Sequence, residues 1–76
     1  MGREKTAVEK QMEGLRGPIR EAMRKDPGMM HRAYSLEARI ALAEIMGKQA
    51  EVEGLLIRYS ELSTEAKKKI GGDESK

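Results

Sequence analysis

Apolar residues near the start of this 76-residue chain recur at alternating spacings of four and three residues. The members of this pattern are Val8, Met12, Leu15, Ile19 and Ala22. A 3.5-residue period is typical of a helix that packs against another helix along its length. Thr6 followed by Glu9 fits a capping box, which marks a helix start. The pattern therefore favours an all-α fold and predicts a first helix over about residues 6–25.

Gly17-Pro18 stands inside this first expected helix. A proline within a helix removes one hydrogen bond and crowds the carbonyl four residues back, which here belongs to Gly14. The helix could end there and restart with Pro18 at its first position. Because the apolar spacing continues past the proline, we expect a kinked helix instead.

A second helix is expected after a turn. Asp26-Pro27-Gly28 is a strong turn signal, and we interpret residues 26–34 as a connection. Ser35 is a good N-cap, which places the second helix at about residues 35–59. Its larger apolar residues are Ala38, Leu42, Ile45, Val52, Leu56 and Tyr59. Gln49 is the polar member of that stripe, and it either fixes the register of helix packing or lies at the edge of the stripe.

Small residues form another stripe on this second expected helix, roughly opposite the large one. They are Ala43, Gly47, Ala50 and Gly54, at spacings of four, three and four. Two glycines inside a helix cost about 1 kcal/mol each relative to alanine. Close approach by another helix would explain that cost, whereas an exposed face on which small residues do no harm is the alternative.

The C-terminal part has two interpretations. Ser60 or Ser63 could cap a short third helix over residues 64–70, or the second helix could continue unbroken to Ile70. Residues 71–76 are expected to form a flexible tail. The prediction is thus a single helical domain over residues 1–70, folded as an all-α helical hairpin of two main helices with a short third helix as an option.

The amount of core material suggests that the hairpin associates with copies of itself. The chain has no Phe, Trp or Cys, so neither bulky aromatic rings nor disulfides add to its stability. Below about 70–80 residues, a single core rarely supplies more than about 3–5 kcal/mol without such additions. We therefore expect a homo-oligomer, a dimer or larger, in the form of a four-helix-type bundle.

Catalytic, metal and cofactor sites find little support in the sequence. There is one histidine, His31, in the expected turn, and no thiolate ligand is present. No glycine-rich phosphate-binding motif follows a strand. No apolar run is long enough to span a bilayer, and the charged start of the chain does not resemble a signal peptide, so a cytoplasmic protein without membrane contact is expected.

The function expected from these features is non-enzymatic protein–protein interaction or assembly through helix packing, without a cofactor. The expected packing interface consists of Leu42, Ala43, Ile45, Gly47, Gln49, Ala50, Val52, Gly54 and Leu56. One alternative is a small nucleic-acid-binding regulator, because Arg16, Arg20 and Arg24 form a basic ridge at four-residue spacing. A second alternative is an inhibitor or adaptor that binds a larger, heterologous protein.

Overall fold

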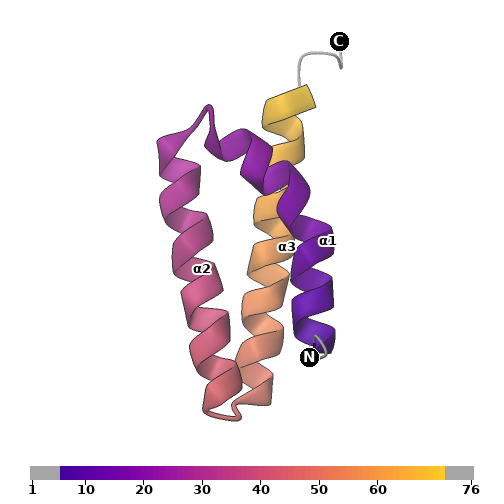
Figure 1. Cartoon of the computed structure of the whole chain (residues 1–76), viewed down its shortest axis with the longest axis vertical. Coiled ribbons are helices and arrows are strands. Elements are labelled where there is room, and N and C mark those ends of the chain that lie inside the picture. The colour runs from indigo at the N-terminus through magenta and orange to yellow at the C-terminus, as the bar shows by residue number, and fades with distance from the viewer. Residues whose placement is uncertain (1–5, 72–76) are drawn as a thin grey trace, which may run out of the picture.

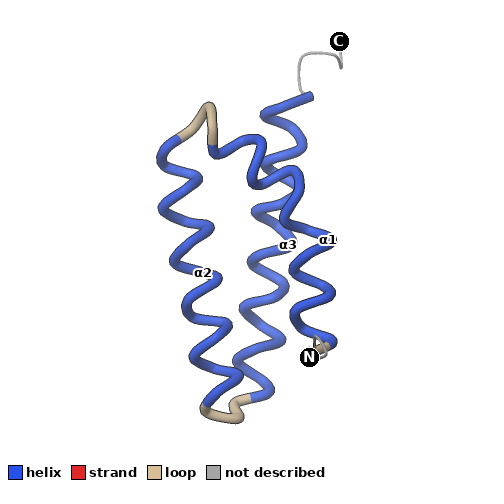
Figure 2. The backbone as a smooth tube through the Cα atoms, viewed as in Figure 1, coloured by secondary structure: helices blue, strands red, loops and turns tan. Residues whose placement is uncertain are grey.

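The computed structural model describes residues 6–71, which form three helices packed side by side (Figure 1). They are α1 (Ala7–Met23), α2 (Pro27–Ile45) and α3 (Gln49–Gly71). No strand occurs within this part of the chain. The backbone runs along the long axis three times in alternating directions (Figure 2), so the α1–α2 turn lies beside the end of α3. The expected all-α class is confirmed, but three helices replace the two-helix hairpin.

Helix α1 begins and continues as its sequence predicts. Thr6 is the N-cap: its Oγ1 accepts a hydrogen bond from Glu9 N at 3.1 Å, and its own backbone N donates to Glu9 Oε1 at 3.2 Å. This confirms the capping box. The helix passes through Pro18 without ending, and its axis changes direction in its second half (Figure 2).

Helix α2 begins eight residues earlier than predicted, so the expected connection over residues 26–34 is wrong. The turn is short, and Asp26 is the N-cap of α2: its Oδ1 accepts hydrogen bonds from Gly28 N at 3.0 Å and Met29 N at 3.4 Å. Pro27 occupies the first turn, where its fixed φ suits a helix and its missing N–H is not needed. Ser35, the predicted N-cap, lies inside the helix instead.

Helix α2 also ends earlier than predicted, because Gly47 breaks the expected helix over residues 35–59. Gly47 has a φ of +73°, a conformation that glycine adopts without a steric penalty. Its N–H donates to Glu44 O at 3.1 Å, and Lys48 N donates to Ala43 O at 2.9 Å. These two bonds form a Schellman motif, which satisfies the last carbonyls of α2 and reverses the chain.

Helix α3 is continuous from Gln49 to Gly71, so residues 64–70 belong to it and do not form a separate short helix. Neither Ser60 nor Ser63 caps a helix start. Ser63 is buried and donates to Leu15 O at 2.9 Å, which links α3 to α1. Gly71, the first residue of the expected tail, is the last residue of α3, and residues 72–76 lie outside the described part.

The three helices share one hydrophobic core. Its buried apolar residues are Met12, Ile19, Ala22, Met29, Ala33, Ile40, Ala43, Val52, Leu55, Tyr59, Leu62 and Ala66. Every helix contributes to this set, and α3 packs against both α1 and α2. One copy of the chain therefore closes a core by itself. Residues that could contact a second copy are therefore to be found on the surface of this three-helix unit.

Candidate interaction surface on the second helix

The predicted stripe of small residues does not form a groove. Ala43 is buried in the core on α2, Gly47 lies in the turn, and Ala50 and Gly54 are exposed on α3. Because the chain reverses at Gly47, the spacing that aligned these residues on one helix has no structural meaning. The prediction that these four residues form one stripe on a single helix is wrong.

The other predicted packing residues have different environments. Val52 is buried on α3 and Leu56 is half-buried beside it. Gln49 is exposed as the first residue of α3, and thus it is not a polar position in a seam. Leu42 and Ile45, by contrast, are exposed near the end of α2.

These two residues belong to a larger exposed surface, which we call the α2 outward face. It consists of Met30, Tyr34, Ala38, Ala41, Leu42 and Ile45, with Met46 just after the helix. At 100° per residue, the six helical members fall within about one third of the helix circumference, on the side away from the core. His31 and Ser35 are the polar residues among them, and none of the charged residues of α2 lies on this face.

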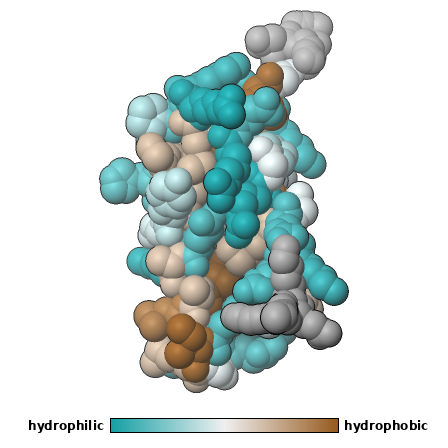
Figure 3. Space-filling view, viewed as in Figure 1, coloured by the Kyte–Doolittle hydropathy of each residue, from teal (hydrophilic) through white to brown (hydrophobic). Residues whose placement is uncertain are grey.

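The exposure of the α2 outward face is large for apolar side chains. Its five large members are between 38% and 81% exposed, with Ile45 at the upper limit. Among the large apolar residues exposed in the described chain, Ile57 on α3 is the only one elsewhere. Figure 3 shows the broadest hydrophobic area at the lower left, over the end of α2 and the turn to α3. Exposed apolar surface is thus concentrated on one helix.

The charged residues of α2 flank this face, and all but Arg39 form hydrogen bonds with other parts of the chain. Arg32 binds Glu65 on α3 with both terminal nitrogens, at 3.1 and 2.7 Å, which lowers the pKa of the Glu65 carboxyl below its usual value. Glu44 accepts a long hydrogen bond of 3.5 Å from Thr6 Oγ1. Arg39 is exposed and forms no ion pair within residues 6–71.

Glu37, the remaining charged residue of α2, joins a polar contact to which each helix contributes one residue. Tyr59 of α3 is fully buried, and its hydroxyl donates to Glu37 Oε2 at 2.5 Å. Arg16 Nε of α1 lies 3.7 Å from the same carboxylate oxygen. Burial, and then the bond to Glu37, raise the pKa of Tyr59 to about 12, against the opposing effect of Arg16. This contact connects the three helices, and sequence analysis did not find it.

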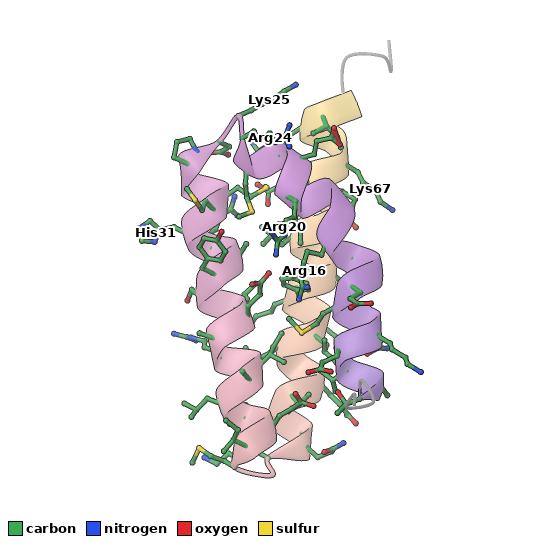
Figure 4. All side chains as sticks on the ribbon, viewed as in Figure 1. Arg16, Arg20, Arg24, Lys25, His31 and Lys67 are labelled. Atoms are coloured by element: carbon green, nitrogen blue, oxygen red, sulfur yellow. The ribbon has the colours of Figure 1, made fainter. Side chains whose placement is uncertain are left out.

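The predicted basic ridge is only partly open to solvent. Figure 4 shows Arg16, Arg20 and Arg24 one above another along α1. Arg20 and Arg24 are exposed, but Arg16 is half-buried and directed to Glu37 and Tyr59. Two of the three predicted nucleic-acid contacts therefore remain available.

His31 and the acidic residues are spread over the surface of the described chain. His31 projects away from the helices (Figure 4), and residues 6–71 contain no group of three His, Cys, Asp or Glu side chains that could hold a metal ion. The groove between α2 and α3 is lined by side chains of both signs, including Arg39, Arg58 and Glu61. Of the helices described, none has the length and apolar character needed to cross a membrane.

Comparison with family models, curated proteins and solved structures gives no match for this chain.

Proposed function

We propose that this protein acts in assembly, through packing of the α2 outward face against the same face of a second copy. The observation that carries the proposal is the mainly apolar surface on α2, which contains His31 and Ser35 but no Asp, Glu, Lys or Arg, in a chain of which 37% of the residues are charged. Scattered apolar residues are normal on protein surfaces, but contiguous patches of a few hundred Å² often mark interaction sites.

The size of the face fits a reversible dimer. Taking about 200 Å² for a fully exposed large side chain, the five large residues offer roughly 550 Å². Ala38, Ala41 and the flanks of the helix add to this area. Stable interfaces bury about 800 Å² per partner, and weaker transient ones bury less. We therefore expect a dissociation constant in the micromolar range.

The spacing on the face also suits a partner helix. Tyr34, Ala38, Ala41 and Ile45 follow one another at spacings of four, three and four, the period of helices that pack along their length. The two alanines at the centre allow a close approach of the helix axes. Two-fold dimers that use one surface twice are the most common oligomers. Since α2 lies at one side of the molecule (Figure 1), two copies can meet there without disturbing either core.

The test compares two isoleucines. Ile45→Glu places a charge on the α2 outward face, whereas Ile57→Glu places one at a similarly exposed position on α3, where Ile57 is 61% exposed. We expect sedimentation from about 1 to several hundred micromolar to show a reversible dimer for the wild type and for Ile57→Glu, and a folded monomer for Ile45→Glu. A wild-type monomer over the whole range, or equal loss of the dimer in both variants, would overturn the proposal.

A further inference from the structure

We propose that one end of the molecule binds the phosphate backbone of double-stranded nucleic acid, without preference for base sequence. The proposal goes beyond self-association and does not depend on it. It rests on how the charged residues are distributed along the three helices.

The basic residues gather toward the α1–α2 turn. The half of the molecule at this turn comprises residues 16–34 and 61–71, with eight basic and four acidic residues. The other half comprises residues 6–15 and 35–60, with four basic and six acidic residues. Residues 1–5 and 72–76 contribute net charges of +1 and −1. The net charge of +2 is therefore the sum of a half at +4 and a half at −2.

Ion pairs within the chain already neutralise two of the four acidic residues in the positive half. Asp26 Oδ2 lies 3.2 Å from Lys69 Nζ, and Glu65 Oε2 lies 2.7 Å from Arg32 Nη2. The exposed basic residues of this half that form no ion pair within residues 6–71 are Arg20, Arg24, Lys25, Lys67 and Lys68. The excess of positive charge is thus open to a ligand.

Four of these cations, which we call the basic end, project from neighbouring parts of α1 and α3. Arg20 and Arg24 lie on successive turns of α1, about 6 Å apart along its axis, and Lys25 follows in the turn to α2. Lys67 projects from α3 beside the same part of α1 (Figure 4). Arg16, the remaining residue of the predicted ridge, forms an ion pair inside the bundle and is not part of the basic end. One strand of a duplex offers a phosphate for about every 3.4 Å of its axis, so the basic end can contact about four phosphates.

The surroundings of the basic end favour a duplex over a single strand or a membrane. Proteins that bind single strands stack the bases on aromatic side chains, but Tyr59 is buried and Tyr34 lies on α2. Helices that bind membrane surfaces carry an apolar face beside their cations. The four most exposed large apolar residues all lie in the other half of the molecule: Leu42, Ile45, Met46 and Ile57. Contacts to phosphates remain, and these carry no sequence information.

The test measures binding of a short fluorescent DNA duplex, and of an RNA duplex of the same sequence, by anisotropy at several salt concentrations. Four phosphate contacts predict that the logarithm of the binding constant falls with the logarithm of the salt concentration, with a slope of about −3 to −4. The affinity should therefore drop roughly 100-fold between about 50 and 200 mM salt. Both duplexes, and a DNA duplex of a second sequence, should give similar slopes.

Two double variants with the same change of net charge locate the binding surface. Lys25→Ala with Lys67→Ala removes half of the basic end, whereas the control Lys10→Ala with Lys48→Ala removes two exposed lysines from the other half. We expect the first to weaken binding at least tenfold at about 50 mM salt and to reduce the slope by about 2, and the control to change the affinity less than about threefold. Glu21→Gln should tighten binding, because it removes an exposed negative charge beside the cations.

Absence of duplex binding at low salt would overturn the proposal. Equal losses in the two double variants would do the same, since net charge alone would then explain the binding. Vesicles of phosphatidylserine and phosphatidylcholine are a further probe, and we expect them to bind more weakly than either duplex. Tighter binding to the vesicles would assign the basic end to membranes and overturn its assignment to nucleic acid. None of these outcomes bears on the dimer, which Ile45→Glu tests separately.

Discussion

Gly47 and Gly54 look alike in the sequence, yet their backbones differ, and this difference gives a residue-scale prediction. Gly47 has a φ of +73°, where a Cβ atom costs about 1–2 kcal/mol, although no neighbouring atom blocks it. Gly54 lies within α3 with open space around it. We expect urea denaturation to show that Gly47→Ala lowers the free energy of unfolding by about 1–2 kcal/mol, and that Gly54→Ala raises it by up to about 1 kcal/mol.

The same pair of variants separates the observed fold from the hairpin that the sequence suggested. If residues 35–59 formed one long helix, both glycines would be helical, and both alanine variants would be more stable than the wild type. A gain of stability in Gly47→Ala would therefore contradict the turn between α2 and α3. Whether Gly47→Ala raises or lowers the free energy of unfolding therefore tests whether α2 and α3 are separate helices.

At the scale of the helices, the contact among Arg16, Glu37 and Tyr59 predicts a cost for losing one hydroxyl. Tyr59→Phe keeps the buried ring but leaves the Glu37 carboxylate without its donor. Hydrogen bonds to charged groups contribute about 1.5–3 kcal/mol, and we expect a loss of that order in thermal or urea unfolding. The control is Tyr34→Phe, which removes an exposed hydroxyl and should change stability little. Equal effects of the two variants would show that the contact does not hold the helices together.

The same tyrosine also predicts how stability changes in alkaline solution. The pKa of Tyr59 rises from 10.0 to about 12 in the folded chain, so its neutral form is favoured there. This contribution is fully present below pH 10 and is lost as the pH rises from 10 to 12. Tyr59→Phe should therefore flatten the decline in stability over that interval, whereas Tyr34→Phe should not. A decline of the same slope in wild type and Tyr59→Phe would assign it to other groups.

The helices also show how far the sequence could be interpreted. The all-α class and the position of α1 were predictable, because the Thr6–Glu9 capping box and the spacing of the apolar residues both indicate a helix that starts there. The ends of α2 were not predictable, because the sequence motif at each end is compatible with two structures. Asp26-Pro27 fits a turn but also an N-cap followed by the first helical position, and Gly47 fits a close helix contact but also a helix end. Packing decides between these meanings: with residues 27–34 helical, Met29 and Ala33 lie one turn apart on the same side and are buried in the core.

Predicting the α2 outward face from the sequence requires the first and last residues of α2. Leu42 and Ile45 were named from the sequence but were assigned to a stripe that continued through Val52 and Leu56. With α2 starting at Pro27, the same positions, together with Ala38, align with Met30 and Tyr34 on the outer side. The charge-free face is visible in the sequence only after the start of the helix is known. The contact of Tyr59 with Glu37 joins two helices and two residues that are 22 positions apart, and no local sequence pattern indicates it.

At the scale of the whole molecule, a core built from one chain predicts that folding and the proposed association are separate events. A folded monomer should persist on dilution, and dimerisation should add stability by mass action. A free partner at 100 times the dissociation constant stabilises the folded state by about 2.7 kcal/mol. For a chain of this length each kcal/mol raises the melting temperature by about 4–8 °C. We therefore expect the melting temperature of the wild type to rise by about 10 °C or more between concentrations far below and far above the dissociation constant.

Ile45→Glu provides the reference for this rise. Its melting temperature should stay constant with concentration and should match that of the wild type at high dilution, because Ile45 lies outside the core. Calorimetry over a thousandfold range of concentration compares the two curves. A wild type that loses its helical circular dichroism on dilution would mean that the core is incomplete without a partner. Two flat and equal curves would instead mean that the apolar face of α2 does not bind a second copy, so the two results distinguish a failure of the fold from a failure of the interface.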